Sequence, residues 1–194
     1  LTAATLYQFI AASTDIAGNT GSAVVSFTTK APDYGARIVT EPVVHIGVLS
    51  GTIAGVAVPG DGLTQGVTEA VSGAGSRVSV EYALHTAASP TLIDSLTLQG
   101  VVAWSDQDGA AEDLIAEVRV TVPGGGYGWQ QITLPFQAVP PSAYVDASGD
   151  VLLSFSDTAS IKRERKDTLK VDYLVGEVLE LVPRNVEVEV IELM

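Results

Sequence analysis

The sequence predicts an all-β sandwich, and two observations carry that prediction. Apolar and polar residues alternate along many short stretches, as they do in strands that bury one face. Turns rich in glycine, proline and asparagine separate these stretches. Many short strands divided in this way are typical of two packed sheets.

The alternation is clearest in residues 114–122, where apolar side chains take every second position while Glu117 and Arg119 share the other face. Residues 110–118 would also fit one face of a helix. The alternation continues to Val122, so we predict a strand from Leu114. One helical turn at 110–113 is left open. The same period recurs in residues 7–11, 78–82, 93–101, 152–155, 169–175 and 186–190.

Length and charge exclude several classes of partner. The chain has 194 residues, of which 46% are hydrophobic and 17% charged, which is enough for one domain with a sizeable core. Its net charge of −13 repels phosphate backbones and anionic lipid, so we expect neither nucleic acid nor a bare membrane as partner. No apolar run is long enough for a transmembrane helix. The chain opens on Leu1, so we expect any export signal to lie upstream.

Enzymatic chemistry is not indicated. The chain has no cysteine, which excludes disulfides, thiolate metal sites and a cysteine nucleophile. The two histidines, His45 and His85, lie in apolar, strand-like surroundings that favour a half-buried structural role. The acidic residues show no distinctive spacing, and motifs of serine hydrolases and zinc proteases are missing from the sequence. We therefore expect no enzyme activity in this chain.

The opening segment has Tyr7 and Phe9 on one strand-like stretch, the turn Asp15-x-Ala-Gly-Asn19 and the ending Phe27-Thr-Thr29. In this pattern it resembles the last part of a fibronectin type III domain. That resemblance implies a hairpin, with a tyrosine on the next-to-last strand and an Asp-x-Ala-Gly-Asn turn before the last strand. Two strands alone cannot bury their apolar faces, so either upstream strands or strand donation between subunits must cover them. The matching residues are Leu1, Thr5, Tyr7, Phe9, Asp15, 17–19, Val25 and 27–29.

The main body contains the stretch Gly128-Trp129-Gln-Gln-Ile132 and, later, Asp167-Thr-Leu-Lys-Val-Asp-Tyr-Leu174. With these pieces, residues from about 34 to 181 resemble the galactose-binding-like, jelly-roll modules of secreted prokaryotic hydrolases and surface proteins. The resemblance implies a jelly-roll β-sandwich in which Trp129 lies in a core strand. Prolines near residues 32 and 183 suggest the boundaries: a partial fibronectin-like segment at 1–32, the sandwich at 33–182, and an extra strand or a following domain at 183–194. The matching pieces are 61–65, 68–69, 78–82, 93–98, 128–132, 149–155 and 167–174.

Two groups of carboxylates are candidates for calcium. Asp106, Asp108 and Asp113 surround Gly109 and resemble a fragment of a calcium loop, although the closing acidic residue of an EF-hand is missing and a solvated acidic turn is the alternative. The jelly-roll resemblance implies a structural calcium as well. The residues available for that second site are Asp61, Glu69 and Asp172.

Two aromatic residues are candidates for ligand contact. Tyr127 lies in the glycine-rich loop 123–129, where its ring could stack on a sugar, and Trp104 ends a strand, where it is either core or rim. The loop lacks the Lys-Ser/Thr of a phosphate cradle. The basic run 162–166 is either a solvated loop or a dock for an acidic surface.

We therefore expect a non-catalytic structural, assembly or adhesion module of an extracellular, multidomain cell-surface protein. The alternative is a carbohydrate-binding accessory module of a secreted hydrolase, with polysaccharide as its partner. Neighbouring domains or subunits are expected to join through the terminal strands, among them 186–190 with its alternating valines and glutamates.

Overall fold

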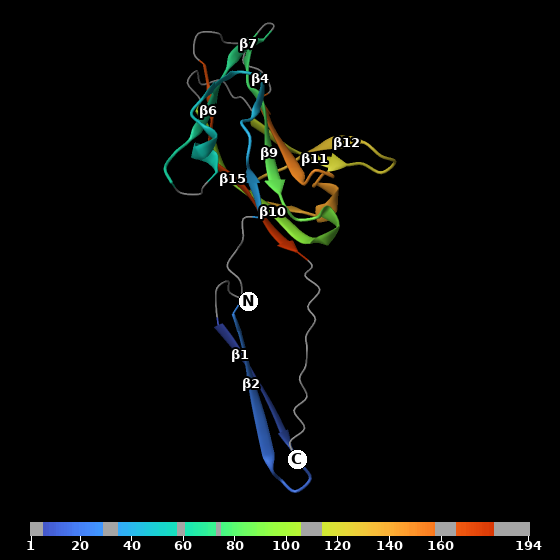
Figure 1. The fold of residues 1–194 in the computed structure, drawn as a ribbon. Helices are drawn as coiled ribbons and strands as arrows, with labels where there is room; N and C mark the ends of the chain where they lie inside the picture. Colours follow the sequence, from blue (N-terminus) through green and yellow to red (C-terminus); the bar gives the residue numbers. More distant parts are fainter. Residues whose placement is uncertain are drawn as a thin grey trace. The chain divides into compact units, whose positions relative to one another are not determined.

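The computed structural model describes residues 6–28, 35–57, 61–72, 75–105, 114–157 and 166–180 (Figure 1). The chain divides into two compact units, Leu1–Asp33 and Tyr34–Met194. Every strand pair among the described residues is antiparallel. None of the helices among the described residues has the length and hydropathy needed to cross a membrane.

The first unit is a two-stranded hairpin of β1 (Leu6–Thr14) and β2 (Thr20–Thr28). Its turn is ordered by the Asp15 carboxylate, which accepts hydrogen bonds from the backbone N–H of Ala17 at 2.9 Å and of Asn19 at 2.8 Å. The Asn19 side chain donates a third, and these bonds hold the pKa of Asp15 below its usual value. The expected hairpin is therefore present, while its kinship to fibronectin type III domains stays a prediction.

The second unit is a β-sandwich whose two layers share one continuous network of strand pairs. The short strand β3 (Ala36–Ile38) joins them, because it pairs with one strand of each layer. The first layer has the order β12 (Tyr127–Gln131), β11 (Leu114–Thr121), β14 (Asp150–Asp157), β9 (Ser79–Thr86) and β4 (Val43–Ile46).

The second layer is built around the two longest strands. Its order is β5 (Val48–Ser50), β6 (Gln65–Thr68), β15 (Thr168–Glu180), β10 (Ile93–Ser105) and β13 (Phe136–Ala138). A separate ribbon and three short 3₁₀ turns complete the described elements: β7 (Ala70–Ser72), β8 (Gly75–Arg77), η1 (Ile53–Val56), η2 (Pro90–Leu92) and η3 (Pro141–Ala143).

The core lies between the layers and follows the predicted alternation. Val80, Tyr82 and Leu84 of β9 are fully buried, and they face Leu96 and Leu98 of β10 in the same core cluster. Their intervening neighbours point outward, as the two-residue period of a strand requires. The all-β, jelly-roll-type prediction is thus confirmed as an antiparallel β-sandwich.

The predicted strand from Leu114 is also confirmed, since β11 runs from that residue to Thr121. The helical turn left open at 110–113 lies outside the described residues, as does the expected boundary near residue 183. Gly100 of β10 is required by close packing, because a Cβ there would lie 2.5 Å from Leu174 Cδ2 and 2.8 Å from the Tyr173 carbonyl oxygen.

Candidate ligand-binding site

β12 is the last strand of the first layer (Figure 1). It carries two exposed aromatic side chains. Tyr127 is 58% exposed and Trp129 is 42% exposed. They are two residues apart on one strand and so share a face. Across the β11–β12 ladder, Thr121 lies opposite Tyr127 and Arg119 lies opposite Trp129. We call these four residues the platform.

The expected burial of Trp129 is wrong. Tyr144, beneath the opposite face of β12, donates a hydrogen bond from its hydroxyl to Gln130 Oε1 at 2.8 Å. On β11 the fully buried residue is Val118, whereas Arg119, opposite Trp129, is only partly buried. The tryptophan therefore shares the outer face of the layer. Its glycine-tryptophan phrase resembled a core strand, but a phrase of this length does not specify which side of the sheet faces the core.

Arg119 links Tyr127 to the rest of the layer. Its guanidinium carbon lies 4.4 Å from the centroid of the Tyr127 ring, within the range of a cation–π contact. The same guanidinium donates from Nη2 to Asp146 Oδ2, and both side chains of this ion pair are about four-fifths buried. The pair fixes the guanidinium over one face of the tyrosine ring.

The carboxylate of Asp146 is itself held in a tight turn. Its Oδ1 accepts hydrogen bonds from the backbone N–H of Ser148 at 2.8 Å and of Asp150 at 2.9 Å. Burial acts to raise the pKa of Asp146, but these bonds and the guanidinium outweigh it and hold the pKa below its usual value. Gly149 closes the turn at φ +85°. Arg119 therefore faces a permanently charged partner near neutral pH.

Both histidines pair with single carboxylates on the same layer. His85 Nδ1 lies 2.8 Å from Asp150 Oδ1, and His45 Nε2 lies 3.0 Å from Glu81 Oε1. The two imidazoles are nearly half exposed. Both histidines are thus more exposed than expected, and their structural role stays a prediction.

Trp104 and Tyr127 are in different surroundings. Trp104 is only partly exposed and packs against the core, opposite Leu169 of β15. Its indole Nε1 is buried without a hydrogen-bond partner. Of the two predicted ligand contacts, the structure therefore places Tyr127 on an open face and Trp104 between the layers.

The calcium candidates divide into two cases. Asp106, Asp108 and Asp113 lie outside the described residues. Asp61 is exposed and its Oδ1 accepts a hydrogen bond from the Leu63 N–H at 2.8 Å, Glu69 is fully buried, and Asp172 is half-buried. Within the described ranges, no three histidine, aspartate or glutamate side chains are grouped as a metal site would need. Calcium binding stays a prediction.

The fold brings Glu69 together with two carboxylates that sequence reasoning did not select. Glu69 Oε2 accepts the N–H of Asp167 at 3.0 Å, and its carboxyl group hydrogen-bonds with that of Asp157. Asp157 Oδ2 also accepts the Val78 N–H at 3.1 Å. Burial raises the pKa of Asp157 above its usual value, and this outweighs the hydrogen bonds that act to lower it. No local sequence signal joins residues so far apart.

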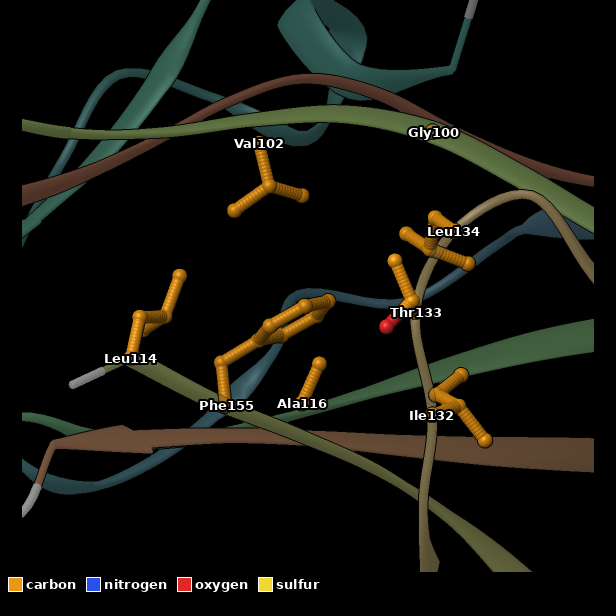
Figure 2. A pocket seen from close by; sticks show the side chains of 8 residues that line it. All are labelled: Gly100, Val102, Leu114, Ala116, Ile132, Thr133, Leu134 and Phe155. Carbon is orange, nitrogen blue, oxygen red and sulfur yellow. The ribbon is translucent and has the colours of Figure 1, made fainter.

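A cleft of about 270 Å³ opens between the layers (Figure 2). Gly100 and Val102 of β10 form one side, while Phe155 and Ala116 of the first layer face them. The segment leading to β13 closes a third side. Thr133 supplies the polar side chain in an otherwise apolar lining. The lining residues are Gly100, Val102, Leu114, Ala116, Ile132, Thr133, Leu134 and Phe155.

Comparisons with known proteins show little. No protein-family model matches the chain. No curated protein matches it either. One similar solved structure comes from work on the promiscuous specificity of carbohydrate-binding modules of the β-sandwich superfamily. It is 15% identical, with a TM-score of 0.35 over 91% of this chain and 74% of that one. At that TM-score the likeness carries no weight for function.

Proposed function

We propose that this chain is a non-catalytic carbohydrate-binding module and that the platform is its ligand surface. The observation that carries the proposal is the exposure of Tyr127 and Trp129 side by side on one face of β12. Aromatic rings of this size are usually buried, and exposed ones next to each other mark binding surfaces. The apolar face of a pyranose ring packs on such a surface.

The polar groups of the platform suit a neutral glycan. Arg119 presents N–H donors beside the Tyr127 ring, and its charge is balanced by Asp146. Thr121 adds a hydroxyl on the same face. The net charge of −13 disfavours an anionic polymer at long range. A neutral polysaccharide is therefore the class of ligand that this surface fits best.

Affinity electrophoresis in gels that contain soluble neutral polysaccharides tests the proposal. Retardation of the chain is expected with at least one of them. Trp129→Ala and Tyr127→Ala should each weaken binding about tenfold, since truncating a central aromatic contact typically costs one to a few kcal/mol.

Leu63→Ala is the matched control, because Leu63 is 54% exposed and belongs to the segment before β6 rather than to the platform. It should bind like the unaltered chain. If the chain is not retarded by any polysaccharide tested, or if Leu63→Ala weakens binding as much as Trp129→Ala, the proposal is wrong.

We propose as a second function a structural or adhesive role within a multidomain protein at the cell surface. The separate two-stranded hairpin of β1 and β2 favours it, because such a hairpin is marginally stable in water unless other strands or domains cover it. Amide hydrogen exchange of the hairpin tests this idea. Protection that increases when flanking domains of the natural protein are present supports it, and equal exchange with and without them contradicts it.

A further inference from the structure

The outer edge of β10 is only partly paired. On one side β10 is matched with β15 from Ile93 to Ser105. On the other side β13 pairs with it only over Leu96–Leu98. Within the described part of the chain, the edge from Gln99 to Ser105 thus has no ladder partner on that side. Val101 of this edge is 48% exposed. Such an apolar, unpaired edge is a template for another strand.

The cleft next to this edge has a mostly apolar lining. β13 begins only at Phe136, so it does not pair with the rest of the β10 edge. Just before it, the Leu134 side chain lies next to Gly100. Ile132 donates its backbone N–H to the Ala116 carbonyl of the first layer at 2.9 Å. Val102 lines the cleft from β10. A strand added in line with β13 would place every second side chain on the face of the sheet to which Val102 belongs.

The sequence contains a segment with the matching pattern. In residues 186–190, Val186, Val188 and Val190 alternate with Glu187 and Glu189. Three valines at two-residue spacing fit an apolar cleft on one side of an added strand, and the glutamates then face outward. A register that sets Val188 opposite Val102 and Val186 opposite Trp104 puts these valines on the cleft side, because directly opposed residues share a face of the sheet. We propose that residues 186–190 of a second copy of this chain add to the β10 edge as an antiparallel strand.

The chain's own segment cannot reach this position. Glu180 pairs with Ile93, at the far end of β10 from Val101. Eight residues of strand separate Ile93 from Val101, a distance of about 26 Å. The chain from Glu180 to Val186 spans at most about 22 Å when fully extended. The donor is therefore another copy, and either reciprocal exchange or a head-to-tail chain of copies results.

The local charges beside this edge suit the two glutamates of the segment. Lys170 of β15 lies opposite Ala103 in the ladder and is exposed on the outer face. Lys166 precedes by two residues Thr168, which lies opposite Ser105. The added strand would bring Glu187 and Glu189 about two strand spacings from these lysines, roughly 10 Å, where attraction persists at low ionic strength. Asp172 is the carboxylate on the same stretch of β15, and it lies at the bulge in the ladder.

Light scattering of the full 194-residue chain gives the first test. The average mass should rise from one copy toward two or more with increasing concentration. Val188→Asp places a charge over the apolar cleft and should return the mass to one copy, while Glu189→Gln, which changes an outward residue, should leave association within about threefold. A single-copy mass at every concentration up to 1 mM, or association unchanged by Val188→Asp, would overturn the proposal.

Disulfide cross-linking locates the contact. Because the sequence has no native cysteine, every disulfide must join introduced cysteines. Chains with Ala103→Cys are mixed with differently tagged chains carrying Glu187→Cys or Glu189→Cys and are then oxidised. At least one mixture should give the mixed disulfide in more than tenfold excess over a control that carries Thr91→Cys, at an exposed position near the opposite end of β10. Equal yields from Ala103→Cys and Thr91→Cys would contradict the assigned edge.

Discussion

Replacing Tyr82 with phenylalanine should stabilise the protein. Tyr82 is fully buried in β9, and its ring meets Phe155 edge-on at a centroid distance of 6.0 Å. Its hydroxyl is buried without a hydrogen-bond partner. Burial, with the charge of Glu41 as the second cause, raises the pKa of this hydroxyl, so it stays neutral at any working pH. The substitution thus removes an unsatisfied polar group and keeps the ring contact.

The size of the gain follows from two opposing contributions. An unsatisfied buried hydroxyl costs about 1–3 kcal/mol of folding free energy. Removing one oxygen atom loses some dispersion contacts at roughly 0.1–0.2 kcal/mol each. The net expectation for Tyr82→Phe is an increase of about 1 kcal/mol in the free energy of unfolding. For a chain of this length, that corresponds to a rise of about 2–4 °C in Tm.

Tyr144→Phe is the matched control, because the hydroxyl of Tyr144 donates to Gln130 at 2.8 Å. The same substitution there should lower the free energy of unfolding by about 0.5–1.5 kcal/mol. Urea unfolding followed by tryptophan fluorescence measures both variants against the unaltered chain. If Tyr82→Phe lowers stability as Tyr144→Phe does, the Tyr82 hydroxyl has a partner such as a buried water, and the reasoning is refuted.

Three further predictions concern charge and close packing. The pKa of Asp157 is raised, so the folded chain keeps this proton to a higher pH than the unfolded chain does. The contribution of Asp157 to the free energy of unfolding therefore falls as the pH rises above about 4. Asp157→Asn should flatten this part of the pH profile of unfolding. The lowered pKa of Asp146 has the opposite sign, so Asp146→Asn should cost about 1–3 kcal/mol at pH 7, and calorimetry should show that loss vanish near pH 2. Gly100→Ala should cost about 1–3 kcal/mol in urea unfolding, and Gly128→Ala, with 3.2 Å to the nearest side-chain atom, should cost less. A pH profile unchanged by Asp157→Asn, a loss that persists near pH 2, or a harmless Gly100→Ala would each contradict its prediction.

The alternation of side chains could be read without coordinates because it is local. Each strand exposes one face to water and buries the other, so Val80, Tyr82 and Leu84 reveal β9 by spacing alone. A second local signal selected Tyr127, because a glycine-rich loop between strands leaves its neighbouring side chains exposed. It could not decide the side of Trp129, because β12 ends a layer and its two faces differ only through the strands that pack beneath them.

What the sequence by itself determined is the class of fold, the hairpin before the sandwich and the absence of cysteine chemistry, since each follows from spacing or composition. What only the tertiary structure decided depends on residues distant along the chain. Strand order placed Arg119 over Tyr127, left the end of β10 without a partner, and buried Glu69 beside Asp167, 98 residues away. Local patterns do not encode such contacts, because they arise from which strands pair and in which register.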